Sequence, residues 1–161
     1  MEKASEERYL AGVCGLYCGA CPVYLGHAEK DPALIEEIPK KFFAAFDITP
    51  KYIIDTGCDG CLSSNPMPWC ATCEVRKCAS DKGTTWCFEC VDFPCKRLQA
   101  LEMEFQRPLI RNLKEMKEKG VGKWLEAVGK RYECPKCGKK LHWYSFGVCS
   151  RCGKTPTRAG D

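Results

Sequence analysis

The sequence predicts a small, metal-stabilised α+β protein, in which short helices and zinc-knuckle hairpins are followed by a C-terminal zinc ribbon. Three observations predict this fold class. Cysteine accounts for 15 of the 161 residues, Leu, Ile, Val and Phe together make up about a fifth of the chain, and six cysteine pairs share a two-residue gap. So little apolar surface rarely offsets the ordering entropy of a domain this size. The composition therefore excludes a large enzyme barrel and a membrane span, and favours stabilisation by metal.

The cysteines are predicted to be metal ligands and not disulfides. An odd number of cysteines cannot close completely into intramolecular bridges, and residues 1–10 are charged and contain no apolar signal segment. We therefore expect a reducing, cytoplasmic location, where dense cysteine patterns usually bind metal. A C-x2-C turn lets both sulfur atoms face one ion, and the six pairs are Cys18/Cys21, Cys58/Cys61, Cys70/Cys73, Cys87/Cys90, Cys134/Cys137 and Cys149/Cys152.

The formal net charge of +4 counts every cysteine as neutral. Metal-bound cysteines are thiolates, so three zinc sites of four thiolates each would bring the net charge to about −2. The headline charge therefore does not predict a generally basic, nucleic-acid-binding protein.

Composition divides the chain into three segments. Residues 1–98 hold eleven cysteines and form a predicted cysteine-rich metal-binding domain. Residues 99–133 contain no cysteine and are predicted to be a helical connector that packs on this domain. Residues 134–161 hold the last four cysteines and form the predicted zinc ribbon.

Helix signals are clearest between the cysteine clusters. Pro32 is a first-turn residue of a helix over 31–46, whose apolar side chains recur at helical spacing, and Pro39 should bend or split this helix. A short turn or helix is expected to begin at Thr49-Pro50.

Three amphipathic stretches after Cys95 are also predicted to be helices that pack into the core. The first covers 98–105, the second runs from Pro108 to Gly120, which is a natural C-cap, and the third begins at Val121. Strands are expected only as short hairpins beside the metal-binding turns.

The last cysteines form two C-x2-C-G turns that flank a short aromatic segment typical of a β-hairpin. They are Cys134, Cys137, Cys149 and Cys152. Gly138 and Gly153 each follow a turn where a positive φ angle is needed. The pattern resembles a zinc ribbon, which is a tetrahedral, coordinatively closed and structural site. Because four thiolates are available, His142 is expected to be a surface residue and not a ligand.

Basic and aromatic side chains surround this predicted ribbon, and proteins use both kinds to bind nucleic acid. They are Lys136, Lys139, Lys140, Arg151, Lys154 and Arg158, with Trp143, Tyr144 and Phe146. A solvated positive face around an ordinary hairpin core is the interpretation we favour, with nucleic-acid binding as the alternative. We expect a protein partner and no membrane association.

Cys14, Cys18 and Cys21 form a C-x3-C-x2-C triad. Radical S-adenosylmethionine enzymes share this spacing, but the chain lacks room for their barrel. The remaining interpretations are a zinc ion with His27 or a distant cysteine as its fourth ligand, or an iron–sulfur cluster.

Eight further cysteines within 38 residues suffice for two four-thiolate sites. The sequential assignment is Cys58, Cys61, Cys70 and Cys73 for one site and Cys78, Cys87, Cys90 and Cys95 for the other. A cross-braced arrangement that exchanges pairs fits the spacing nearly as well, and both zinc and iron accept four sulfurs. We expect about three to four zinc ions in total, with an iron–sulfur cluster in place of one zinc as the alternative.

The succession CGLYCGACPVY, CDGC, CEVRKCASDKG and CFECVDFPC resembles the domain of unknown function 3795 family, cysteine-rich proteins of bacteria and archaea. The resemblance covers about residues 10–98, and the helix-plus-ribbon tail resembles that of some members. It implies metal binding and an intracellular location but no reaction. The matching positions are Cys14, Cys18, Cys21, Cys58, Cys61, Cys73, Cys78, Cys87, Cys90 and Cys95, with Cys70 the weakest match.

The sequence shows no phosphate-cradling glycine loop, Ser-His-Asp order or H-E-x-x-H helix, and it has only two histidines. It therefore favours a zinc-stabilised binding, adaptor or regulatory module over an enzyme. One alternative is an iron–sulfur protein for electron transfer or redox sensing, with its cluster at the triad. The other is a metal-transfer or thiol enzyme that uses the triad's cysteines.

Overall fold

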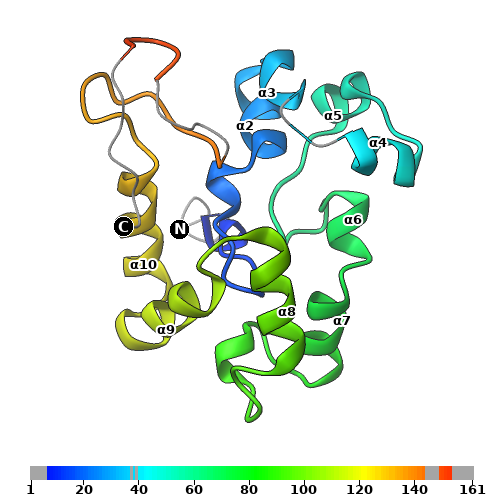
Figure 1. Ribbon diagram of the computed structural model, residues 1–161, viewed down its shortest axis with the longest axis vertical. Coiled ribbons are helices and arrows are strands. Elements are labelled where there is room, and N and C mark those ends of the chain that lie inside the picture. The colour runs from blue at the N-terminus through cyan, green and yellow to red at the C-terminus, as the bar shows by residue number, and fades with distance from the viewer. Residues whose placement is uncertain (1–6, 37, 39, 144–148, 154–161) are drawn as a thin grey trace. The chain divides into compact units, whose positions relative to one another are not determined.

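The computed structural model describes residues 7–36, 38, 40–143 and 149–153, and it shows a succession of short helices joined by loops (Figure 1). Its 3-10 helices are η1 (Arg8–Leu10), η2 (Cys18–Ala20) and η3 (Cys87–Glu89). Its α-helices are α2 (Pro22–Glu29), α3 (Pro32–Glu36), α4 (Lys40–Phe46), α5 (Pro50–Thr56), α6 (Pro68–Ala71), α7 (Glu74–Asp81), α8 (Lys96–Phe105), α9 (Leu109–Lys119) and α10 (Val121–Arg131).

The helices predicted from apolar spacing are confirmed. The predicted helix over 31–46 is split into α3 and α4 on either side of residue 39, which lies outside the described residues. The Thr49 hydroxyl accepts a hydrogen bond from the Tyr52 amide at 3.2 Å and caps α5. α8, α9 and α10 follow in the predicted order, with Gly120 as the C-cap of α9.

The fold is more helical than the sequence predicts. The described residues contain no strand, only isolated antiparallel bridges between Ala11 and Tyr17 and between Glu133 and Lys140. The predicted knuckle hairpins are therefore not confirmed, and the tip of the ribbon, 144–148, lies outside the described residues. Within the described part, no helix has the length and apolarity needed to cross a membrane.

Three helices in the cysteine-rich segment, α2, α6 and α7, are not predicted from the sequence. α6 and α7 escape a periodicity search because they are short and few of their side chains are buried, and α2 escapes it because its eight residues show no amphipathic pattern. Cys21 is the N-cap of α2, Cys73 the N-cap of α7 and Cys95 the N-cap of α8. Several candidate ligands thus stand where a helix begins.

The chain divides into two units, each assembled from separated parts of the sequence. Unit 1 comprises Met1–Cys18 and Asp59–Leu125, and unit 2 comprises Gly19–Cys58 and Glu126–Asp161. The sequence instead predicts three successive segments, and that division stays a prediction.

In unit 1 a loop over residues 11–17 is tied to distant parts of the sequence. The Trp86 indole N–H donates to the Ala11 carbonyl at 3.3 Å, and the Cys87 amide donates to the Val13 carbonyl at 3.0 Å. The Asn112 side-chain amide of α9 donates to the Gly15 carbonyl at 2.8 Å. Leu98, Leu109, Leu113 and Met116 are buried in this unit. The loop that carries Cys14 is therefore fixed by the cysteine-rich turn and by α9.

In unit 2 the helices α2, α3 and α5 pack together around buried Ile35 and Ile53. The His27 ring of α2 donates from Nδ1 to the Ile54 carbonyl at 2.8 Å and lies against Gly57 at the end of α5. His27 thus joins two helices through one of its ring nitrogens.

Gly15 gives a test of how tightly the loop over 11–17 is packed. Its φ is +91°, and an added Cβ would lie 2.4 Å from the Leu109 carbonyl oxygen and 2.8 Å from Leu113 Cγ. We expect Gly15→Ala to lower the free energy of unfolding by about 3 kcal/mol, from backbone strain and overpacking together. The measurement is urea denaturation of the metal-loaded protein.

Gly83→Ala is the matched control, because Gly83 has a φ of +68° but no neighbour within 4 Å of an added Cβ. It carries only the backbone cost, about 1 kcal/mol. Equal losses of unfolding free energy in the two variants would show that α9 does not pack closely against the loop.

Candidate metal centre

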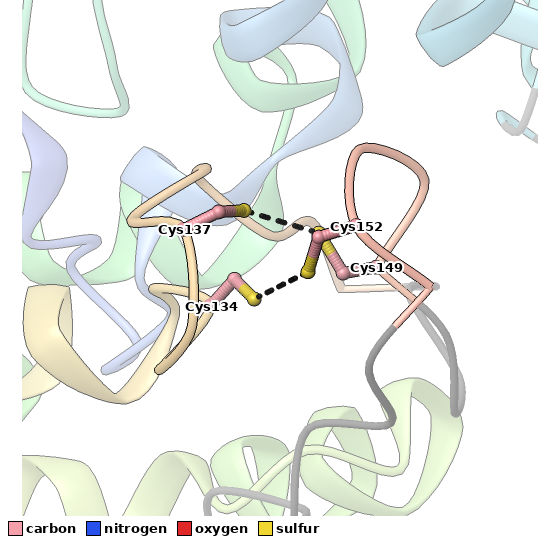
Figure 2. A group of neighbouring side chains, drawn as sticks. All are labelled: Cys134, Cys137, Cys149 and Cys152. Carbon is pink, nitrogen blue, oxygen red and sulfur yellow. Dashed lines mark hydrogen bonds between the residues drawn. The ribbon is translucent and has the colours of Figure 1, made fainter.

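Four cysteines near the C-terminus form one compact group. The sulfur atoms of Cys134, Cys137, Cys149 and Cys152 all lie within 4.8 Å of one another. The Cys134 and Cys152 sulfurs are 3.6 Å apart, and the Cys137 and Cys149 sulfurs are 3.7 Å apart (Figure 2). Among the described residues, no other set of three or more His, Cys, Asp or Glu side chains meets the same criterion. The sequence prediction of a four-cysteine group here is confirmed.

Two turns of matching geometry bring these sulfurs together. The Gly138 amide donates to the Cys134 carbonyl at 2.8 Å, and the Gly153 amide donates to the Cys149 carbonyl at 2.9 Å. Both glycines have a φ of +70°, a conformation that other residues adopt at a cost. The C-x2-C-G sequence therefore produces the same tight turn twice, with its two sulfurs on one side.

Backbone amides prepare the first cysteine of each turn to bind metal. The amides of Lys136 and Cys137 lower the pKa of Cys134 to about 6. The amides of Arg151 and Cys152 likewise lower the pKa of Cys149. A hydrogen bond donated to a thiolate stabilises its charged form, which is the form that binds metal.

The neighbouring sulfurs act in the opposite direction on Cys137. The Lys139 amide lowers the pKa of Cys137, but burial and hydrogen bonds with the other thiols outweigh it and raise the pKa to about 11. Without a cation, the four side chains cannot all be thiolates at neutral pH. A bound divalent ion would offset the repulsion between the four thiolates, because it attracts each of them.

The spacing of the sulfurs fits a single tetrahedral ion. Four thiolates at the usual zinc–sulfur distance stand about 3.8 Å apart, and the observed 3.6 and 3.7 Å separations are close to this value. With four protein ligands the ion would have no open position for substrate or water. The residues therefore fit a structural metal ion.

The predicted basic and aromatic face is described only in part. Lys136, Lys139 and Arg151 are exposed or half-buried, and Lys140 forms an ion pair with Glu133. Tyr144, Phe146, Lys154 and Arg158 lie outside the described residues. His142 is not part of the four-cysteine group.

A second set of cysteines in unit 1 lines one cavity. Cys78, Cys87, Cys90 and Cys95 all line it, which is the sequential grouping that the sequence suggested. Burial, followed by neighbouring thiols, raises the pKa of Cys87 to about 12, and these neighbours are Cys95, Cys78, Cys90 and Cys73. As metal ligands these residues stay a prediction.

Lys82 also lines the cavity and was not identified from the sequence. Its ammonium group donates to Cys90 Sγ at 3.5 Å and forms an ion pair with Asp92. No local sequence pattern pairs Lys82 with Cys90, which lies eight residues further along the chain, so this contact depends on the fold.

The other predicted ligands are distributed over both units. In unit 1, Cys14 is near Cys61 and Cys73, and in unit 2, Cys21 is near Cys58. Cys18 and Cys70 are half-buried. The unit boundary falls between Cys18 and Gly19, and the ligand roles of these cysteines stay predictions.

The surroundings of two triad cysteines raise the pKa values of their thiols. Burial, together with nearby Cys61, raises the pKa of Cys14 well above its usual range. Burial raises the pKa of Cys21 to about 12, although the Tyr24 and Val23 amides act against it. The thiolate is both the nucleophilic and the metal-binding form of cysteine, so burial disfavours both roles unless a bound cation stabilises the thiolate.

Replacing one cysteine of the C-terminal group tests whether the group binds one ion. We expect Cys149→Ser to lower the zinc content by one equivalent per chain, because three thiolates hold the ion far less tightly than four. Elemental analysis of the purified protein gives the ratio. The control is Ser150→Ala, an exposed change in the same turn. Equal zinc in the Cys149→Ser variant and the wild type would rule out a metal ion at this group.

Comparisons with known proteins agree with the cysteine pattern. No match is found among curated proteins or solved structures. The profile of one family, described as protein of unknown function (DUF3795), matches residues 10–100. The chain therefore belongs to the DUF3795 family.

Proposed function

We propose that this chain is a multi-zinc protein that binds a protein partner as an adaptor or regulatory module. The observation that carries the proposal is the C-terminal group, in which four sulfurs lie within 4.8 Å of one another. A metal site with four protein ligands has no open coordination position for a substrate, so its role is structural and not catalytic.

Zinc is the ion that the C-terminal group fits best. It takes four thiolates in a tetrahedron, and it has no redox chemistry that would expose the thiolates to damage. Ligation requires reduced thiolates, which supports a cytoplasmic location for the protein.

A protein partner is the proposal that the charge pattern supports. Lys140 is already paired with Glu133, which reduces the positive charge that the ribbon offers to phosphate groups. Nucleic acid is the alternative partner for the basic residues Lys136, Lys139 and Arg151.

Metal removal tests the structural role of zinc. We expect a high-affinity zinc chelator to abolish most of the helical circular dichroism, because metal binding supplies folding free energy in proteins with few apolar residues. Adding zinc should restore the signal, whereas adding magnesium, which prefers oxygen ligands, should not. A metal-free chain that keeps its spectrum and its melting temperature would contradict the proposal.

A further inference from the structure

The cavity in unit 1 is built by cysteines from three neighbouring elements. Cys78 lies on α7, Cys87 begins η3, Cys90 follows η3, and Cys95 is the N-cap of α8. All four side chains line the same cavity.

The two four-cysteine groups of this chain differ in spacing. In the C-terminal group the sulfurs have closed to 3.6 and 3.7 Å, the spacing of ligands around a single ion. In the cavity no three of the four sulfurs lie within 4.8 Å of one another. Among the described residues, only the C-terminal group meets that criterion. In a four-iron cluster each of the four thiolates binds a different iron, so the thiolates stand farther apart than the ligands of one ion. The cavity's sulfurs therefore lack the single-ion spacing of the C-terminal group, and a four-iron centre accommodates this wider spacing.

The surroundings of the cavity also suit such a centre. Val75, Ala79 and the fully buried Leu98 contribute apolar walls, and the four cysteines are half-buried. Lys82 donates to Cys90 Sγ at 3.5 Å, while Asp92 holds its ammonium group in place. A hydrogen bond to a ligand sulfur is one of the means by which proteins tune iron–sulfur clusters.

We propose that the cavity holds an iron–sulfur cluster on Cys78, Cys87, Cys90 and Cys95, with Lys82 donating a hydrogen bond to the Cys90 ligand. This site goes beyond the proposed function, which rests on zinc at the C-terminal group. It also differs from a cluster at Cys14, Cys18 and Cys21, the position that the sequence suggested.

The test uses the full chain, purified without oxygen and reconstituted with ferrous iron and sulfide. We expect a brown protein with equal equivalents of iron and acid-labile sulfide, in addition to zinc. Cys90→Ala and Cys87→Ala should each lose the visible absorption and most of the iron while keeping the zinc of the C-terminal group. Val91→Ala is the matched control, because Val91 is 95% exposed in the same turn. It should keep the cluster.

Three results would overturn the proposal. The first is a wild-type chain that takes up no iron and sulfide. The second is one zinc ion bound by these four cysteines. The third is a cluster that survives Cys87→Ala and Cys90→Ala but disappears in Cys14→Ala. Cys149→Ser separates this proposal from the proposed function, since it should remove zinc and leave the iron and sulfide content unchanged.

Lys82→Met gives a second measurement that does not depend on removing a ligand. Lys82 is exposed, so the variant should fold and keep the cluster. Losing a cationic hydrogen-bond donor beside the sulfur should shift the reduction potential to more negative values. An unchanged potential would place the cluster away from Lys82 and overturn the assignment.

Discussion

The crowding of sulfur atoms is the constraint on which this structure depends. At the C-terminus four cysteines lie within 4.8 Å of one another, and their thiolates would repel each other without a cation. Two C-x2-C-G turns reduce this repulsion in part, because their backbone amides lower the pKa values of Cys134 and Cys149. A metal ion would complete this arrangement, because its charge would stabilise four thiolates that the turns alone cannot stabilise.

The small number of apolar residues in the chain accounts for the architecture of unit 1. Its helices are short, and hydrogen bonds from Trp86, Cys87 and Asn112 fix the loop over residues 11–17. This loop carries Cys14 towards Cys61 and Cys73 in the same unit. The helix that packs through buried Leu109 and Leu113 therefore also fixes the loop that positions Cys14.

Local signals made much of the helical structure and the C-terminal group predictable. Pro32 and Pro50 mark the starts of α3 and α5, and the apolar spacing of α8, α9 and α10 is regular over ten or eleven residues. The geometry of the paired C-x2-C-G turns was predictable because it depends on neighbouring residues, including the glycine after the second cysteine of each turn.

The remaining features depend on contacts between distant residues. α6 and α7 are too short for a periodic signal, α2 shows no amphipathic pattern, and nothing in the sequence pairs Asn112 with Gly15 or Lys82 with Cys90. Cysteine spacing alone left the sequential and cross-braced assignments open, whereas the tertiary fold brings Cys78 and Cys87 to one cavity in unit 1. Similarly, sequence reasoning offered the triad as the alternative site of an iron–sulfur cluster, and the fold adds the cavity that Cys78, Cys87, Cys90 and Cys95 line.

X-ray absorption at the zinc edge tests the central claim most directly, because it reports the atoms bound to zinc in the intact chain. The account predicts a shell of four sulfurs at about 2.3 Å and no nitrogen or oxygen ligand. Nitrogen or oxygen atoms in that shell, or a folded chain that contains no zinc, would contradict it.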